Sequence, residues 1–479
     1  MKFKRIGKQF FIILSYLLFS VLQGKAQTNM VFYPTENQIN SPNLNPAFLT
    51  SQSKFTFGIF PLSGMNVGYN NQLVIKNMLF KIMNGKQTND DFKDVFNSMV
   101  KLDLFYQRME NNIINIGYNS NFGSFDFRIR ENMQLMTDLK GDFSEMVTNT
   151  SLQTLPQGIK QQTFPAIALY YREYSIGYAK EIIKEKLTVG IRAKVYFGKS
   201  STVSEVSGTV SPNSANRIDL QTSGQLKISA PLKIITDNGV LSAVQLSNGF
   251  TLGNYLMNSH NTGTGFDVGF NYKLTPDLAF SASVLDVGSI KWNNNLNTMK
   301  FVGSGTIKPG PTNSPRIDEF SQLYKIETDS LPFSTSLPTT FYAGLKYRIN
   351  PKLNVSIVNR FISTRSMSFN SLSVSGVYDV KKNLSISSGY SIIGKSYSNI
   401  PFAILYTGEA GQYYIGTDDL LSMIAPSASD FSGITFGMCF FLFKNKSKYK
   451  EHEYLPFYKE KKTISVDRNG LIKRNASEK

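Results

Sequence analysis

The chain has little of the residues on which most enzymes and metal proteins depend. Its single cysteine, Cys439, excludes disulfides within the chain and cysteine-based zinc sites. The two histidines, His260 and His452, are far apart and lack ligand-like neighbours, which argues against a histidine-based metal site or a Ser-His-Asp triad. Paired catalytic carboxylates, a phosphate loop, a dinucleotide fingerprint and a G-x-S-x-G elbow are also missing. We therefore expect no enzyme activity, no catalytic residue, no cofactor and no metal.

Long apolar runs are missing too, with one exception at the N-terminus. Basic residues gather over 2–8, an apolar stretch covers 10–22, and Gly24-Lys25-Ala26 places small residues where a signal peptidase cuts. The apolar stretch is shorter than the roughly 20 residues of a membrane-spanning helix, so a retained anchor is the less favoured alternative. The sequence predicts a cleaved signal peptide over 1–26. The mature chain then begins at Gln27, which rules out a lipoprotein of the N-terminal-cysteine type.

Beyond residue 26 the composition suits a membrane β-barrel. Charged residues make up only 18% of the chain and aromatic residues 13%. A barrel has no continuous apolar run, because its apolar residues alternate with polar ones. The formal charge of +17 falls to +12 when the five basic residues of the signal peptide are removed. A basic exported protein suits contact with anionic lipid headgroups and lipopolysaccharide, and no aromatic-basic motif indicates nucleic acid.

The organising pattern is an alternation with a period of two residues. From Gly265 to Leu274, apolar side chains share one face and small or polar side chains share the other. Thr275-Pro276-Asp277 then predicts a turn, because Pro pre-sets φ and Asp bonds to the neighbouring backbone. The next strand resumes at Leu278. The apolar members of the first strand are Phe266, Val268, Phe270, Tyr272 and Leu274.

The same hairpin recurs along the chain. A strand over 341–349 is followed by the turn Asn350-Pro351-Lys352 and by a strand from Leu353. The series Gly269, Tyr272, Pro276, Leu278 has the same spacing as Gly344, Tyr347, Pro351, Leu353. Such repeats with tight turns are typical of barrels whose short turns face the periplasm. Together with a last strand over 433–443, they give roughly 14 to 16 strand candidates.

A soluble β-sandwich or propeller is the alternative to a membrane barrel. Its strands are about 5–6 residues long, whereas those of this chain run nearer 9–12, the length of a tilted strand that crosses a bilayer. Charged residues on the second face, such as Arg192, Lys194, Lys346 and Arg348, suit a wet or plugged lumen and would be costly in a dry core. The sequence therefore predicts an all-β fold, a transmembrane antiparallel β-barrel.

Several segments depart from the alternation. Thr88–Val100 has the capping box and apolar spacing of an amphipathic helix, and 241–257, 315–326 and 417–424 are weaker helical candidates. We expect them to be short loop helices, with a gating role as the sharper alternative. Ser204–Ser229 is rich in Ser and Thr and predicts strands that extend beyond the membrane.

The tail over 444–479 is compositionally distinct from the barrel. It holds eleven basic and five acidic residues and predicts a solvated periplasmic extension, with docking to an acidic partner as the alternative. The expected division is thus a signal peptide (1–26), an N-terminal segment (27–53), the barrel (54–443) and this tail.

One motif stands apart near the mature N-terminus, where the sequence reads Ser-Pro-Asn-Leu-Asn-Pro-Ala-Phe-Leu over 41–49. Pro42 and Pro46 fix φ and bias the preceding residues to extended or turn geometry, which predicts a rigid, non-helical connector. An ordinary lead-in to the first strand and a functional hatch both fit this pattern.

With this motif and the Pro-turn hairpins, the chain resembles the FadL/PorV-like superfamily of outer-membrane barrels. The stretch Gly265–Trp292 is also similar to strands of PorP/SprF-type Bacteroidetes proteins. Within the superfamily, the chain most resembles an uncharacterised Bacteroidetes outer-membrane family, the domain-of-unknown-function family 5723. The resemblance implies about 14 strands, with the hatch motif Asn45, Pro46 and Ala47 folded into the lumen.

The resemblance also implies two alternative roles. The first, which we favour from the polar strands beyond the bilayer and the basic tail, is a binding, scaffold or accessory component of a cell-envelope system of the secretion or gliding type. The second is a passive transporter of hydrophobic small molecules, favoured by the hatch-like N-terminus. Expected partners are outer-membrane lipid, lipopolysaccharide, cell-envelope proteins and a hydrophobic ligand, and nucleic acid is not expected. The sequence leaves the ligand-binding residues unknown.

Overall fold

The computed structural model describes residues 30–36, 38–48, 53–70, 104–138, 160–213, 217–237, 240–247, 249–307, 324–394, 396–421 and 431–443. The predicted signal peptide, the helix expected over Thr88–Val100 and the basic tail lie outside these residues. In the described part, no helix has both the length and the apolar character needed to cross a membrane.

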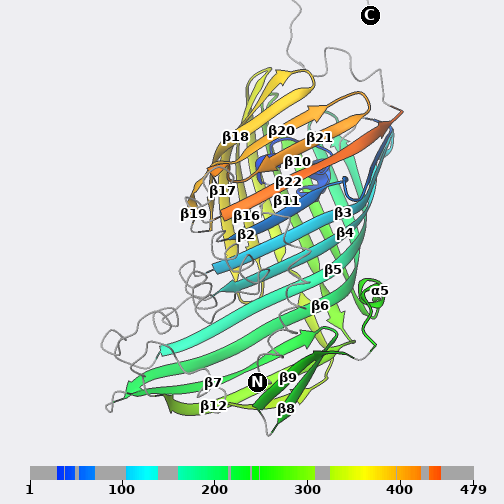
Figure 1. Cartoon of the computed structure of the whole chain (residues 1–479). Coiled ribbons are helices and arrows are strands. Elements are labelled where there is room, and N and C mark those ends of the chain that lie inside the picture. Colours follow the sequence, from blue (N-terminus) through cyan, green and yellow to red (C-terminus); the bar gives the residue numbers. More distant parts are fainter. Residues whose placement is uncertain are drawn as a thin grey trace, which may run out of the picture. The chain divides into compact units, whose positions relative to one another are not determined.

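The described chain is dominated by one antiparallel sheet that closes on itself (Figure 1). Its wall has fourteen strand positions, because three positions are each built from two short strands that follow one another. In chain order the wall consists of β1 (Phe55–Ile59) with β2 (Met65–Asn70), β3 (Leu104–Ser120), β4 (Gly123–Asp138), β5 (Lys160–Ile183), β6 (Leu187–Asn213), β10 (Asn261–Lys273), β11 (Leu278–Trp292), β14 (Phe333–Ser336) with β15 (Thr339–Asn350), β16 (Leu353–Ser363), β17 (Ser368–Lys381), β18 (Leu384–Ile393), β19 (Ser396–Asn399) with β20 (Phe402–Thr407), β21 (Gly411–Thr417) and β22 (Phe431–Leu442).

The barrel closes between its first and last strands. β22 pairs with β1, where Phe55 lies opposite Leu442, and with β2, where Met65 lies opposite Phe436. Every strand position of the described wall thereby has a hydrogen-bonded neighbour on both sides, which is the requirement for a sheet in lipid. The turns predicted at 275–277 and 350–352 are confirmed, since β10 and β15 end there and β11 and β16 begin. We call the barrel end that carries these short turns the turn end and the opposite end the loop end.

The two faces of the wall are inverted relative to a water-soluble protein. On β17, Ser371, Ser373 and Ser375 face inward and are at most 2% exposed, whereas the intervening Leu372 and Val374 are 39% and 43% exposed. Exposed apolar side chains and buried polar ones are stable only when the outer solvent is itself apolar. The fold is therefore a transmembrane antiparallel β-barrel, as the alternation predicts.

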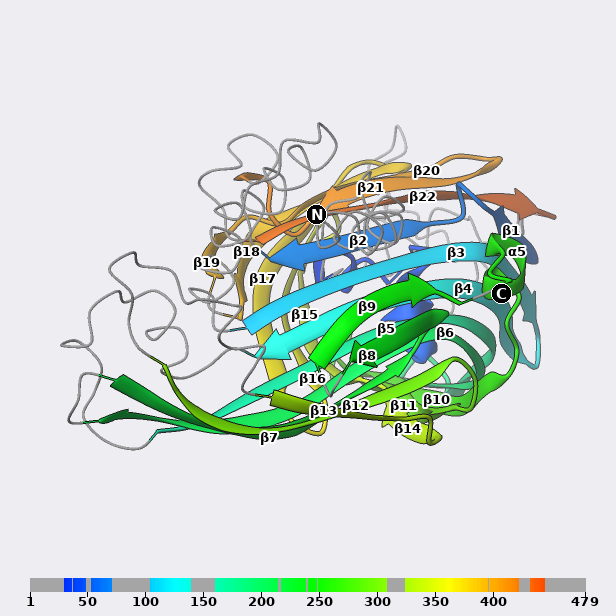
Figure 2. The same cartoon turned by 60° about the horizontal axis from the view of Figure 1, so that its bottom comes forward.

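Beyond the loop end, β5 and β6 continue past the wall, and the same sheet extends from β6 into a part that we call the wing sheet. It adds β7 (Arg217–Ser229), β12 (Leu296–Ile307) and β13 (Tyr324–Asp329) in the order β6–β7–β12–β13 (Figure 2). Strands extending beyond the membrane were expected over Ser204–Ser229, and they are confirmed as the end of β6 and as β7.

The expected helix over 241–257 is wrong in its first part. β9 (Val240–Leu246) pairs with β8 (Leu232–Asp237) as a hairpin, and only α5 (Leu252–Leu256) is helical. A hairpin partner satisfies the backbone groups that a helix would satisfy internally, so tertiary pairing overrides the local pattern. Residues 324–326 likewise belong to β13, whose partner is β12.

Candidate functional site

A segment that is not part of the wall fills the turn-end half of the lumen. We call it the plug: the described residues of 30–48, drawn in blue inside the barrel in Figure 1. It consists of three 3-10 helices, η1 (Met30–Phe32), η2 (Ser41–Asn43) and η3 (Pro46–Phe48). Pro42 and Pro46 lie in the first turns of η2 and η3, where a missing N–H costs nothing.

Strands from most of the circumference touch the plug. η3 contacts β5, β6 and β10, and η1 contacts β17, β18, β20 and β21. An element that touches opposite walls of a closed barrel lies in its lumen.

The predicted hatch motif lies against the wall at β6, β10 and β11. The Asn45 side chain donates from Nδ2 to the backbone oxygens of Phe270 (3.1 Å) and Ala282 (3.2 Å), and its Oδ1 accepts from the Ala47 N–H (2.9 Å). Asn45 is 0% exposed. One side chain thus bonds two neighbouring strands and also fixes the turn into η3. The structure brings Asn45, Pro46 and Ala47 together in the lumen; whether they move as a hatch stays a prediction.

Two paired glycines make room for this motif. Gly190 on β6 lies opposite Gly269 on β10. A Cβ at Gly190 would lie 2.3 Å from the carbonyl carbon of Pro46, and a Cβ at Gly269 would lie 2.1 Å from Oδ1 of Asn45. Both distances are far inside van der Waals contact, so only glycine lets the plug backbone approach the wall this closely.

The apolar side of the plug packs on aromatic side chains of the wall. Phe32 meets Tyr414 edge-on with ring centroids 5.4 Å apart, and Tyr33 stacks on Tyr342 at 5.2 Å. Met30 and Val31 are fully buried in the same cluster. Apolar burial and ring contacts therefore add to the polar contacts that hold the plug.

Charged side chains of the wall also bond the plug. Arg192 donates from Nη1 to the Pro42 oxygen (2.7 Å), and Arg128 donates to the side-chain oxygen of Asn43. Lys346, near the turn end, forms an ion pair with Glu36 at 2.6 Å. The predicted placement of Arg192 and Lys346 on the inner face is thus observed.

Above the plug, toward the loop end, the lumen is crossed by buried ion pairs. Lys194 lies at their centre, with Nζ 2.6 Å from Asp286 and 2.7 Å from Asp267, and Arg130 bonds Glu173 at 2.7 Å. Buried pairs of this kind are costly to form and more costly to break singly. We call this set the ionic layer; its members are Arg108, Glu110, Asp126, Arg128, Arg130, Glu173, Arg192, Lys194, Asp267 and Asp286.

Asp286 enters this layer through an irregularity in β11. The β10–β11 register shifts between Phe266 and Val268, and Asp286 has a positive φ of 61°. Its N–H donates to Oδ1 of Asp267 at 2.8 Å. A bulge turns a side chain away from strict alternation, and as a result Leu285 and Asp286, adjacent in sequence, are both buried. Sequence reasoning missed this residue, although an aspartate within an apolar alternation was a signal.

On the loop-end side of the ionic layer, the lumen is filled by apolar and aromatic side chains of the wall itself. The single tryptophan, Trp292, is 0% exposed and donates from Nε1 to Thr335 at 3.1 Å. We call this set the apolar layer; its members are Tyr106, Met136, Ile167, Leu169, Tyr171, Tyr196, Ile290, Trp292, Leu337, Ile362, Met367, Phe369 and Ile393.

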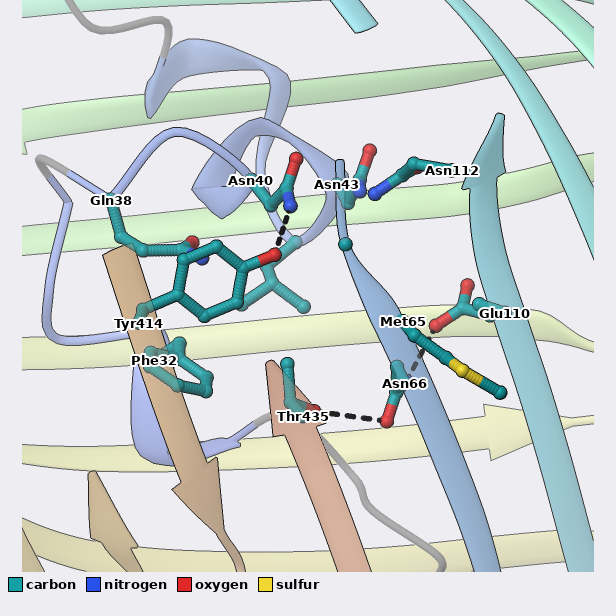
Figure 3. Close-up of a pocket in the computed structure, with 12 residues that line it drawn as sticks. Phe32, Gln38, Asn40, Asn43, Met65, Asn66, Glu110, Asn112, Tyr414 and Thr435 are labelled. Atoms are coloured by element: carbon teal, nitrogen blue, oxygen red, sulfur yellow. Dashed lines mark hydrogen bonds between the residues drawn. The ribbon is translucent and has the colours of Figure 1, made fainter. Parts of the chain in front are cut away.

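Little space remains between the plug and the wall. A cavity of about 30 Å³ lies between Asn40 of the plug, Tyr414 of β21 and Asn66 and Glu110 of the wall (Figure 3). Asn40 donates to Tyr414, Asn66 donates to Glu110 at 2.8 Å, and Thr435 donates to Asn66 at 3.1 Å. This volume suits a water molecule. In the described arrangement the plug closes the lumen here.

No protein of curated function matches the sequence. Among solved structures, the chain resembles the toluene transporter TbuX of Ralstonia pickettii, with 10% identity, a TM-score of 0.37 and coverage of 84% of this chain and 92% of that one. The toluene transporter TodX of P. putida gives 10% identity, a TM-score of 0.35 and coverage of 83% and 92%. A Pseudomonas aeruginosa FadL homologue gives 9%, 0.21, and 84% and 93%.

The sequence also matches a family model over residues 46–418, which covers most of the barrel wall and begins within the plug at Pro46. The chain belongs to the family of unknown function DUF5723.

Proposed function

We propose that this protein is a gated conduit of the outer membrane for small hydrophobic molecules, with the plug as the gate. The observation that carries the proposal is the contrast between the fillings of the lumen. The turn-end half holds a segment that precedes the first wall strand and is not part of the sheet, whereas the loop-end half is lined by inward-facing apolar side chains.

The apolar layer supports a hydrophobic cargo. A water-filled pore for polar solutes is lined by polar side chains. In this chain Ile290, Ile362 and Phe369 are at most 2% exposed and point inward on strands whose outer faces already meet lipid. An apolar lining on the lumen side suits an uncharged apolar molecule that leaves water at the loop end.

The plug supports gating because its contacts with the wall are numerous and individually modest. Hydrogen bonds from Asn45, Arg192 and Ser283 tie it to the wall, and each contributes about 0.5–3 kcal/mol. No covalent bond within the plug ties it to the wall it faces. Release of the plug therefore leaves the wall ladder intact.

A reversible cross-link between plug and wall tests this function. Asn115 of β3 donates to Asn40 of the plug at 2.9 Å, so cysteines at these two positions are within reach of a short bis-thiosulfonate. The N40C/N115C pair is made in a C439A background and reconstituted in liposomes. Uptake of the apolar fluorophore N-phenyl-1-naphthylamine is then followed before and after cross-linking.

We expect cross-linking to lower uptake about tenfold or more and reduction to restore it, while each single-cysteine protein stays unaffected. Uptake equal to that of protein-free liposomes, or equal in the locked and unlocked states, contradicts the conduit.

The scaffold role is a second candidate, and the wing sheet is the observation that favours it. Within the described residues, β13 pairs with β12 alone, which leaves its other edge able to accept a strand from a cell-envelope protein. Purification from detergent extracts tests this role, and the absence of any stoichiometric protein partner counts against it.

A further inference from the structure

A buried cation of the lumen, Arg360, has no anionic partner among the residues that the structure describes. Arg360 on β16 is 1% exposed, and its guanidinium lies over the rings of Tyr106 (5.7 Å) and Tyr342 (5.9 Å). Nη2 donates to the Tyr106 hydroxyl at 3.2 Å, but Nε and Nη1 have no hydrogen-bond acceptor. Within the described residues Arg360 forms no ion pair, whereas each cation of the ionic layer has a carboxylate within 4.0 Å.

Two hydroxyl groups beside Arg360 are also unpaired. Ser371 of β17 lies directly opposite Arg360 in the strand register. Thr340 of β15 lies two residues from Tyr342, which is opposite Arg360 on the other side. Both side chains are 1% exposed, and neither Oγ of Ser371 nor Oγ1 of Thr340 has a partner. Unsatisfied donors on three neighbouring strands therefore face the same part of the lumen.

Unpaired polar groups of this composition are costly to bury. A buried charge without a counter-charge is strongly destabilising, and each unpaired buried hydroxyl adds to the cost. The two aromatic faces offset only part of the cost of burying the cation. An occupant with negative charge and oxygen acceptors removes all three penalties together.

We propose that Arg360, Ser371 and Thr340 form a binding site for a small monocarboxylate. The single guanidinium fits one negative charge, and the hydroxyls donate to carboxylate oxygens. Ile362 and Phe369, buried beside Arg360 and Ser371 on the same strands, suit a small apolar group on the ligand. The site adjoins the plug only through Tyr342, whose ring also stacks on Tyr33, and the proposal does not depend on transport.

Equilibrium dialysis of the purified barrel in detergent, with radiolabelled benzoate as the probe, tests the proposal. We expect one benzoate per chain, displaced by acetate but not by benzamide, the uncharged analogue. R360M removes the charge at similar volume and is expected to weaken binding about a hundredfold, while R360K retains part of it. S371A and T340V are each expected to weaken binding about fivefold.

Folding is checked independently of binding. Since R360M removes an unpaired charge, its urea midpoint is expected to match or exceed that of the parent. The matched control is K300M, which removes an exposed cation of the wing sheet and leaves benzoate binding unchanged. Failure of the parent protein to bind benzoate, equal binding of benzamide, or unaltered binding by folded R360M overturns the proposal. None of these outcomes bears on plug-dependent uptake, because dialysis involves no passage through the lumen.

Discussion

The two halves of the lumen are closed in different ways. The turn-end half is closed by the plug, which bonds to the wall through side chains such as Asn45 and through backbone groups such as the Pro42 oxygen. The loop-end half is closed by side chains of the wall itself, such as Trp292 and Phe369. The ionic layer lies between them. A closure supplied by a separate segment can be removed as one unit, whereas a closure supplied by the wall opens only when its side chains change rotamer.

The largest loss of barrel stability is expected from a substitution in the ionic layer, where the two halves of the lumen meet. K194M removes the cation that faces Asp267, Asp286 and Glu173 and leaves three carboxylates with reduced compensation. Breaking a buried pair in this way costs about 3–5 kcal/mol. The urea midpoint, followed by the fluorescence of Trp292, should fall accordingly. The control K300M breaks an exposed pair with Asp329 and should cost less than about 1 kcal/mol. Equal effects of the two variants would refute a structural ionic layer.

The second largest effect is the release of the plug, which concerns the turn-end half alone. G190L places a side chain where the Pro46 carbonyl carbon lies. If the wall moved to make room, barrel stability would fall by about 1–3 kcal/mol or more. We therefore expect the plug to leave the lumen instead. A cysteine at Ala47 in a C439A background should then react with a soluble maleimide roughly a hundredfold faster. The control is G376L on β17, since the nearest atom to a Cβ at Gly376 lies 3.7 Å away. If G376L exposes Ala47 as much as G190L does, the plug does not depend on the glycine pair.

The barrel wall was predictable from the sequence because lipid imposes a strict rule on it. Most outward positions are apolar, so the alternation through Phe266 and Val268 persists along the strand. The alternation therefore predicts both that the segment is a strand and which of its faces points outward. The repeated glycines of the hairpins were recognised as a spacing but not explained. Gly269 lies under Asn45, and a Cβ at Gly344 would lie 2.5 Å from the Tyr33 ring, so the plug accounts for both.

The ionic layer was not predictable to the same degree. Lys194 and Asp286 are 92 residues apart in sequence, and their contact depends on the strand order, on the register and on the bulge in β11. A one-residue shift of register would turn Asp286 toward lipid. The sequence indicated that Arg192 and Lys194 face the lumen, but their partners follow from tertiary geometry.

A smaller effect on plug docking is expected when hydrogen bonds of the plug are removed and its apolar packing is left in place. N45A removes the donor to the Phe270 and Ala282 oxygens and the acceptor of the Ala47 N–H. Loss of these bonds should weaken plug docking by about 1–3 kcal/mol, which raises maleimide labelling at Ala47 about five- to a hundredfold. N45D keeps the Oδ1 acceptor and loses the donors, so it should also release the plug. Unchanged labelling in both variants means that apolar packing alone holds the plug.

The smallest loss of barrel stability is expected from a substitution in the apolar layer, and its effect should be confined to the loop-end half. I362V removes one methyl group from the apolar layer, where Ile362 is fully buried, and should cost about 0.5–1.5 kcal/mol of barrel stability. Because Ile362 belongs to the apolar layer and not to the cluster that packs the plug, maleimide labelling at Ala47 should stay at the parent level while the urea midpoint falls. The reverse pattern is expected for N45A, whose effect on the wall ladder is indirect. A rise in Ala47 labelling in I362V would show that the two closures are coupled through the ionic layer, and the lumen would then open as one unit.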